Sequence, residues 1–155
     1  MGHVEAICIS MEKGTVKQTI PKGHLLSEWG IEGDAHAGNW HRQVSLLMGE
    51  RIDDMRKLMP SIADGAFAEN LVTRETDLSR CEIGDRLRIG EDILLEVTQI
   101  GKECHHGCEI QQVTGRCIMP TEGIFTRVIQ GGWVTPGDAI QYIGKRREGA
   151  GNSLK

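Results

Sequence analysis

The sequence predicts a mainly β protein, a closed or partly open barrel with a few short helices, and three observations support this. Twenty glycines among 155 residues imply frequent turns. The Val- and Ile-rich runs are brief and are bounded by Gly, Pro, Asp or Asn, which is typical of barrel strands. Hydrophobic residues make up 39% and charged residues 26% of the chain, so it is too apolar for disorder and should form one core.

The first half of the chain should supply a hairpin, a long loop, two strands and a helix. Residues 4–9 and 16–20 flank a polar turn at 12–14 and predict the hairpin. Residues 21–39 are polar and Gly-rich, and we interpret them as a binding loop. An apolar run at 44–48 precedes Ile52, Met55 and Met59, which recur at helical spacing until Pro60. A further strand is expected over residues 67–73.

The second half should add another hairpin and a closing strand. Residues 86–89 and 93–98 surround the turn at 90–92, and residues 139–143 form the last strand. Gly-Asp pairs at 84–85 and 137–138 predict tight turns into strands. Ile124, Phe125, Val128 and Ile129 suggest a short helix stopped by glycines 131 and 132. We expect one domain over residues 1–144 and a flexible tail at 145–155.

Charge and composition narrow the class of partner. The net charge of −4 and the pI near 5.9 argue against general attraction to nucleic acid or an anionic membrane. No apolar stretch approaches the ~20 residues of a membrane span, and the first residues do not resemble a secretory signal. Five cysteines, an odd number, fit reduced thiols. A cytoplasmic protein is therefore expected.

The densest reactive cluster follows the apolar run that ends at residue 100. It contains two thiols, two imidazoles and an amine, namely Cys104, Cys108, His105, His106 and Lys102. A thiol acts as a nucleophile or soft-metal ligand only as thiolate, and neighbouring Lys or protonated His lowers its pKa. These residues are candidates for sulfur or metal chemistry at a thiolate.

Two other interpretations of the cysteines stay open. The cluster could be a zinc site with Cys104, Cys108 and one or both histidines as ligands, or an ordinary exposed loop. Cys117, beside Arg116, could be a second reactive thiol or a buried strand cysteine. Cys8 and Cys81 are expected to be structural.

A second motif covers residues 30–43 and has the composition of an anion-binding loop. Its glycines, among them Gly33, allow close approach of backbone N–H groups, and Arg42 can bind phosphate or carboxylate. Trp40 could stack on a planar heterocycle. Asp34, His36 and His41 could instead bind a metal ion, or the whole stretch could be a surface loop.

A third motif supplies polar groups from the middle of the chain. Glu69 and Asn70 offer acceptors and donors for the polar edge of a heterocycle. Arg127 could add a cation to the same pocket, although an exposed position is the alternative.

Five segments in this order resemble the MOSC family, the C-terminal domain of molybdenum cofactor sulfurases that also occurs as stand-alone bacterial proteins. They are G-I-E-G-D-A-H-A-G at 30–38, G-A-F-A-E-N-L at 65–71, C-E-I-G-D-R-L-R-I-G at 81–90, E-V-T-Q-I-G-K-E-C at 96–104 and G-D-A-I at 137–140. The resemblance implies a β-barrel and a bound molybdopterin-type cofactor. It also implies that one cysteine accepts sulfur as a persulfide or ligates molybdenum, and the matching position here is Cys104.

The resemblance also suggests a composite site and a partner. A molybdopterin-type cofactor would lie between residues 30–42, the Glu69-Asn70 pair and Cys104, with Gly33, Asp34, His36, Arg42 and Arg127 also assigned to cofactor binding. The sequence has no aminotransferase-like sulfurase region, so sulfur should come from a cysteine desulfurase-type donor or from molybdopterin biosynthesis enzymes. The alternatives are a zinc-stabilised binding module and a molybdenum-dependent reductase of N-hydroxylated compounds.

Overall fold

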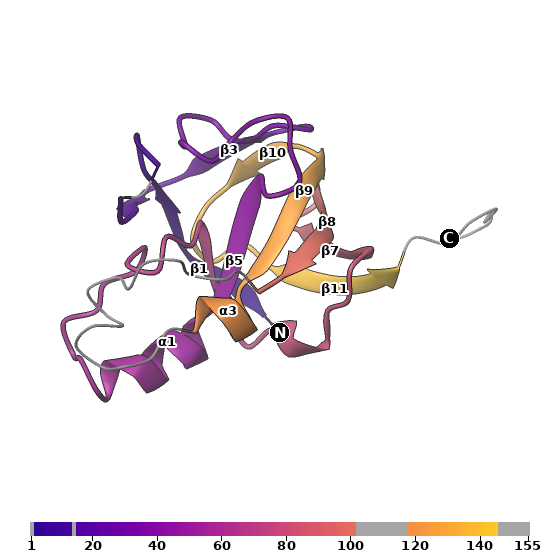
Figure 1. Cartoon of the computed structure of the whole chain (residues 1–155). Helices are drawn as coiled ribbons and strands as arrows, with labels where there is room; N and C mark the ends of the chain where they lie inside the picture. Colours follow the sequence, from indigo (N-terminus) through magenta and orange to yellow (C-terminus); the bar gives the residue numbers. More distant parts are fainter. Residues whose placement is uncertain (1, 14, 102–117, 146–155) are drawn as a thin grey trace.

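The computed structural model describes residues 2–13, 15–101 and 118–145, and its main feature is a curled eight-stranded sheet (Figure 1). The strand order in this sheet is β11-β7-β8-β9-β5-β6-β1-β2. The strands are β1 (His3–Ile9), β2 (Gln18–Ile20), β5 (Val44–Met48), β6 (Leu71–Arg74), β7 (Asp85–Ile89), β8 (Ile93–Ile100), β9 (Ile124–Gln130) and β11 (Ile140–Lys145). The predicted mainly β fold is confirmed, in the form of a half-barrel.

Backbone hydrogen bonds bring the two ends of the curled sheet together. Val4 N–H donates to the carbonyl of Asp138 at 2.9 Å, and Gly137 N–H donates to the carbonyl of Val4 at 2.7 Å. Ile140 N–H donates to the carbonyl of Gly2 at 3.1 Å. The start of β1 is thus fastened to the start of β11, and β2 continues the sheet beyond this junction.

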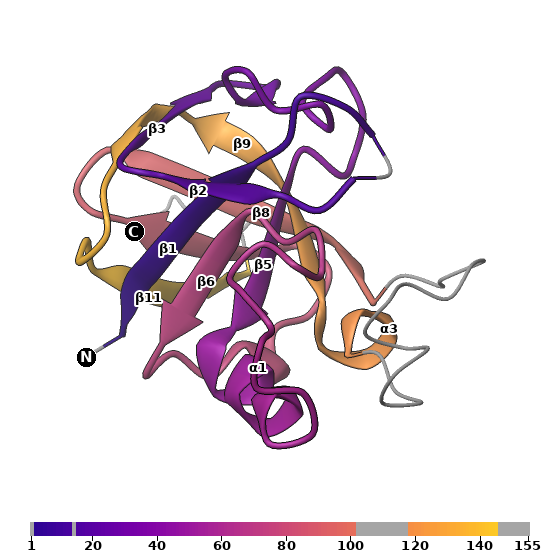
Figure 2. The same cartoon turned by 90° about the vertical axis from the view of Figure 1, so that its left-hand side faces the viewer.

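A small second sheet lies at the upper end of the barrel in Figures 1 and 2. It has the order β10-β3-β4 and consists of β3 (Gly23–Leu26), β4 (Gly30–Ile31) and β10 (Gly132–Val134). The expectation of one uninterrupted loop over residues 21–39 is therefore wrong. Leu25 and Ile31 are buried, and β3 pairs with β10 more than a hundred residues later, a contact that no local pattern reveals.

The helices lie outside the barrel. The helix α1 (Gly49–Arg56) connects the parallel strands β5 and β6 and buries Ile52 and Met55. Two shorter helical segments follow, the 3-10 turn η1 (Leu78–Arg80) and α3 (Met119–Glu122). No helix in the described part of the chain is long and apolar enough to cross a membrane.

Alternation of side chains along the strands divides the core into two clusters. One cluster fills the barrel interior and includes Val4, Ile7, Leu46, Leu87 and Val128. The other lies between the outer face of the sheet and α1, with Ala6, Cys8, Leu47, Ile52, Met55, Val72 and Phe125 among its members. Strands β1, β5, β6 and β9 serve both clusters and so connect the barrel to its helical cover.

Most other sequence-based elements are confirmed, and two more need correction besides the loop at 21–39. Both hairpins form, and Gly84 and Gly137 have φ values of +96° and +100° in the predicted turns. The helix predicted at 124–129 is instead strand β9, which pairs with both β5 and β8. The segment 67–73 becomes a strand only at Leu71. The residues before it form a turn in which Ala68 has a φ of +66°.

Candidate functional site

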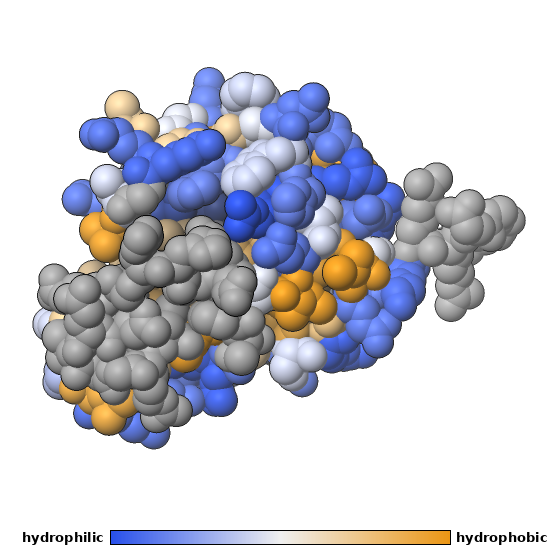
Figure 3. All heavy atoms as spheres, viewed as in Figure 1, coloured by the Kyte–Doolittle hydropathy of each residue, from blue (hydrophilic) through white to orange (hydrophobic). Residues whose placement is uncertain are grey.

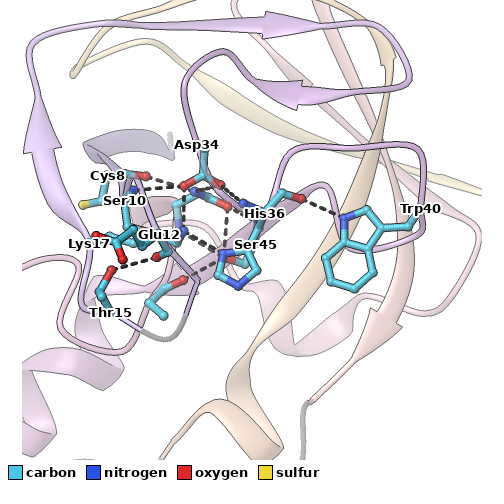
Figure 4. Close-up of polar contacts among 11 residues, drawn as sticks. Cys8, Ser10, Glu12, Thr15, Lys17, Asp34, His36, Trp40 and Ser45 are labelled. Carbon is cyan, nitrogen blue, oxygen red and sulfur yellow. Dashed lines mark hydrogen bonds and ion pairs between the residues drawn. The ribbon is translucent and has the colours of Figure 1, made fainter.

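The centre of the candidate site is a buried ion pair between Lys17 and Asp34. Lys17 precedes β2, Asp34 follows β4, and both side chains are fully buried, with 2.6 Å between Nζ and Oδ1 (Figure 4). The same Oδ1 accepts from the backbone N–H of Ser10 at 3.1 Å. A buried charge is costly unless it is paired and hydrogen-bonded, so each side chain depends on the other.

Asn70 connects this ion pair to three parts of the fold. Its Nδ2 donates to Asp34 Oδ2 at 3.2 Å and to the carbonyl of Cys8 at 3.0 Å. Its Oδ1 accepts from the backbone N–H of Ser45 at 2.9 Å. Asn70 therefore connects β1, β5 and the loop after β4, and its polar atoms make hydrogen bonds within the protein.

Glu69 is fully buried, but it shapes a turn and has no hydrogen bond to Asp34. Its carboxylate accepts from the backbone N–H groups of Gly65 at 2.7 Å and Phe67 at 3.0 Å. Burial raises the pKa of Glu69 to about 7, and the backbone donors oppose this rise only in part. The turn contacts the ion-pair segment directly, because Lys17 N–H donates to the carbonyl of Gly65 at 2.9 Å.

His36 extends the network towards the surface. Its Nδ1 lies 2.9 Å from Lys17 Nζ, and its backbone N–H donates to Asp34 Oδ2 at 3.3 Å. Its carbonyl accepts from the indole N–H of Trp40 at 2.7 Å, and the two rings are nearly parallel, at 12°, with centroids 6.4 Å apart. The buried ion pair thus fixes the backbone and ring of His36, and His36 in turn positions Trp40.

Cations surround Trp40. The guanidinium carbon of Arg42 lies 4.6 Å from the Trp40 ring centroid and 5.8 Å from that of Phe125, and Lys13 Nζ lies 5.4 Å from Trp40. Arg42 is half-buried, and its Nε is a buried donor without an acceptor among the described residues. His41 Nε2 lies 2.8 Å from Gln99 Oε1, which ties this loop to the end of β8. We call Lys13, Trp40 and Arg42 the cationic–aromatic corner.

The corner suits an anionic, planar ligand. Arg42 and Lys13 supply positive charge, and an indole ring offers a stacking surface. The upper part of the face drawn in Figure 3 is mainly hydrophilic. The positive charge at the corner contrasts with the net charge of the whole chain, which is −4.

The structure does not bring Arg127 into the described contacts of this group. Its guanidinium contacts Glu28 at 2.6 Å and Glu96 at 3.2 Å, so two carboxylates already balance it. Gly33 has a φ of +89° after β4, and a Cβ there would lie 3.7 Å from Ile9 Cδ1. There is therefore room for a side chain at Gly33, but the backbone conformation of this turn favours glycine.

The alternative metal site at Asp34, His36 and His41 is wrong for the described structure. Asp34 is engaged by Lys17, and His41 contacts Gln99. Within residues 2–13, 15–101 and 118–145, no group of three or more His, Cys, Asp or Glu side chains is arranged to hold a metal ion.

The predicted thiolate cluster lies outside the described residues. It comprises Lys102, Cys104, His105, His106 and Cys108, and Cys117 also lies there. Cys8 and Cys81 are described, and both are buried. Burial raises the pKa of Cys81 to about 11 and that of Cys8 still further, so neither forms a thiolate readily, in keeping with structural roles.

Sequence reasoning missed Lys17, Lys13, Ser10 and Ser45. Lys17 lies between an exposed Val16 and an exposed Gln18, in a segment that looks like a surface turn. A lysine is rarely buried, and its partners Asp34 and His36 are 17 and 19 residues away. The one local signal for this region was Asp34 and His36 themselves, within the glycine-rich motif.

The fold and the site together define a class: a curled β-barrel whose loop after β4 carries a buried acid–base network and a cationic–aromatic corner. The family model for the MOSC domain matches residues 33–141. The chain therefore belongs to the MOSC family.

Comparison with individual proteins extends this placement. A protein named "Reductase" from Gibberella moniliformis is 35% identical over 86 residues, which is 50% of this chain but only 15% of that protein. The YuaD protein from Bacillus subtilis has a similar structure, with a TM-score of 0.76 and 20% identity over 95% of this chain and 98% of that one. YiiM from Geobacillus stearothermophilus gives a TM-score of 0.68 and 17% identity, covering 97% and 78% of the two chains. At these identities the structural matches establish the fold.

Proposed function

We propose that this chain binds a molybdopterin-type cofactor at the cationic–aromatic corner and that Cys104 carries sulfur or ligates the metal of that cofactor. The observation that carries the proposal is Arg42, a half-buried cation in contact with the rings of Trp40 and Phe125, whose buried Nε has no acceptor among the described residues. Membership of the MOSC family, which is associated with the molybdenum cofactor, supports the same ligand.

The described residues fit such a cofactor in part. Arg42 and Lys13 suit its phosphate, and Trp40 suits its planar ring system. Asp34, Glu69 and Asn70 are already satisfied within the protein, so we assign them to support of the site and not to direct contact. When bound, the cofactor would supply the redox or sulfur chemistry of its metal.

In the sequence, Cys104 follows β8, the strand whose end contacts the loop of Trp40 and Arg42. The carbonyl of His41 accepts from the hydroxyl of Thr98 in β8, so the loop lies against the end of that strand.

The sulfur-carrying step needs no external oxidant. The Cys104 thiolate would attack the terminal sulfur of a persulfide on a donor such as a cysteine desulfurase. A new S–S bond forms on Cys104, the S–S bond of the donor breaks, and the donor cysteine leaves as thiolate. The donor must therefore already hold sulfur at the persulfide level.

Mass spectrometry of the intact protein tests this part of the proposal. The wild type and Cys104→Ser are co-produced with a cysteine desulfurase and analysed without reductant, with Cys81→Ser as a matched cysteine control. We expect a reducible gain of one sulfur atom in the wild type and in Cys81→Ser, and none in Cys104→Ser. An equal gain in Cys104→Ser would remove Cys104 from this role.

A second candidate is a molybdenum-dependent reductase of N-hydroxylated compounds. The name of the Gibberella moniliformis relative favours it, although this chain matches only 15% of that protein. The cofactor-loaded chain, supplied with a reduced viologen as electron donor, should then convert an N-hydroxylated amidine to the amidine. No conversion above that of cofactor-free protein would reject this candidate.

A further inference from the structure

The end of strand β8 contains a β-bulge. Val97 pairs with Thr126 of β9. Gln99, two residues later, pairs with Phe125, which is only one residue away on β9, so Thr98 is an extra residue on β8. Burial alternates along β8 up to Val97, and the alternation ends at the bulge, where Thr98 and Gln99 are both half-buried. A β-bulge changes the direction of side chains locally and is common beside functional sites.

The bulge brings two consecutive side chains to the same residue, His41. In a regular strand, neighbouring side chains point to opposite faces of the sheet. Here the hydroxyl of Thr98 donates to the carbonyl of His41, and Gln99 Oε1 lies 2.8 Å from His41 Nε2. His41 is thus held at both its backbone and its ring, and we call these two contacts the bulge clamp.

Each side chain of the bulge clamp has a second contact within the barrel. The carbonyl of Phe125 lies 3.2 Å from the hydroxyl oxygen of Thr98. Gln99 Nε2 donates to the carbonyl of Gly101 at 2.8 Å. A carbonyl only accepts hydrogen bonds, so the amide nitrogen of Gln99 must face Gly101 and its oxygen must face His41. The barrel therefore sets the orientation of both side chains that hold His41.

His41 lies in the chain between Trp40 and Arg42, two residues of the cationic–aromatic corner. The rings of Trp40 and His41 make an edge contact, with centroids 5.8 Å apart and planes at 72°. The guanidinium of Arg42 contacts the rings of both Trp40 and Phe125. Phe125 is also the residue paired with Gln99 at the bulge, so the bulge and the corner share one position of β9. Holding His41 therefore restricts the positions of both its neighbours.

We propose that the bulge clamp fixes the loop of the cationic–aromatic corner in its ligand-binding conformation. Thr98 and Gln99 are positioning residues, which act through His41 and not by contact with the ligand. The clamp is a property of the chain without ligand, and only its effect on cofactor binding rests on the proposed function. Without the clamp, the loop must be ordered when the ligand binds, and this cost weakens binding.

Nitrogen NMR of the cofactor-free protein tests the clamp. The indole N–H signal of Trp40 is assigned with Trp40→Phe, and its heteronuclear ¹H–¹⁵N NOE reports motion on the ps–ns timescale. The wild type and Gln141→Met, a matched control at an exposed strand position, should show a rigid indole. In Thr98→Val and in Gln99→Met the NOE should fall, whereas Thr98→Ser, which keeps the hydroxyl, should resemble the wild type. An unchanged NOE in both folded variants would overturn the proposal, and so would an equal fall in Thr98→Ser and Thr98→Val.

Cofactor retention measures the consequence of the clamp for binding. Wild type, Thr98→Val and Thr98→Ser are co-produced with molybdopterin biosynthesis enzymes, and the pterin-containing mass is measured by native mass spectrometry. Thr98→Val should retain roughly three- to tenfold less pterin than Thr98→Ser, the factor expected for one hydrogen bond. Equal retention by a Thr98→Val variant with a mobile indole would contradict a role of the clamp in binding. No pterin on the wild type would reject the proposed function, whereas the NMR result would still decide whether the clamp exists.

Discussion

At the scale of single residues, the two buried carboxylates of the site differ in their partners. Asp34 forms an ion pair with Lys17, whereas the donors to Glu69 among the described residues are backbone N–H groups, and Asp64 lies near it. Burial raises the pKa of Glu69 from an ordinary 4.5 to about 7. The protonated form is therefore favoured by folding, and the stability it provides is complete below about pH 4.5 and is lost as the pH rises through about 7.

This direction of the pH dependence of stability predicts the behaviour of Glu69→Gln. Between pH 4.5 and 8 the free energy of unfolding of the wild type should fall by on the order of 3 kcal/mol from this residue alone. Glu69→Gln should lack this fall, because its side chain does not titrate. Denaturant unfolding at several pH values measures the difference, with the exposed Glu91→Gln as control. Parallel curves for the wild type and Glu69→Gln would contradict the assignment.

Asn70 provides a second prediction at this scale. Asn70→Ala removes the partners of Asp34 Oδ2, the Cys8 carbonyl and the Ser45 N–H in a buried position. Buried polar groups left without partners should lower the free energy of unfolding by about 2–4 kcal/mol. Asn39→Ala, at an exposed asparagine of the neighbouring loop, should change it by less than about 0.5 kcal/mol. Equal effects in chemical denaturation would mean that Asn70 does not hold the site together.

At the scale of elements, the turn before β6 must press closely against the segment that carries Lys17. Gly65 has a φ of +92°, and a Cβ there would lie 2.2 Å from the carbonyl oxygen of Lys17. Gly84 has a similar φ of +96° but open space around it. Gly65→Ala should therefore cost clearly more than Gly84→Ala, for which backbone strain alone predicts about 1 kcal/mol. Thermal unfolding of both variants measures the contact, and equal losses would show that the turn and Lys17 are not in contact.

At the scale of the whole molecule, the fold depends on closure between β1 and the approach to β11. The amides of Val4 and Ile140 make hydrogen bonds across this junction. If the junction belongs to the cooperative core, both amides should exchange with solvent as slowly as those of the central strand β5. Hydrogen exchange followed by NMR tests this, and fast exchange at Val4 and Ile140 would indicate a barrel that opens at its edge.

The sequence predicts this fold well where neighbours in the chain are neighbours in space. The hairpins β1–β2 and β7–β8 and the Gly84 and Gly137 turns follow from local patterns. The local pattern does not predict the small sheet, because β3 pairs with the distant β10. It predicts a helix in place of β9, whose two partner strands lie elsewhere in the chain.

The candidate site shows the same limit. The motifs identify Asp34, His36, Arg42, Glu69 and Asn70 as candidates, but they do not reveal the internal contacts of Asp34, Glu69 and Asn70. The Asp34 carboxylate contacts Lys17, which lies 17 residues away in the sequence, so the motif around Asp34 does not reveal this contact. Arg127, a predicted cofactor contact, forms ion pairs with Glu28 and Glu96, which lie far from it in the sequence.

In the proposed function Arg42 anchors an anionic cofactor, and native mass spectrometry measures this binding. Wild type, Arg42→Met and the matched control Arg51→Met, an exposed arginine on α1, are co-produced with molybdopterin biosynthesis enzymes and sprayed under native conditions. We expect a pterin-containing mass on the wild type and on Arg51→Met. In Arg42→Met it should fall at least tenfold, as expected for loss of a charge-assisted hydrogen bond of about 1.5–3 kcal/mol. Equal retention by Arg42→Met, or no pterin on the wild type, would contradict it.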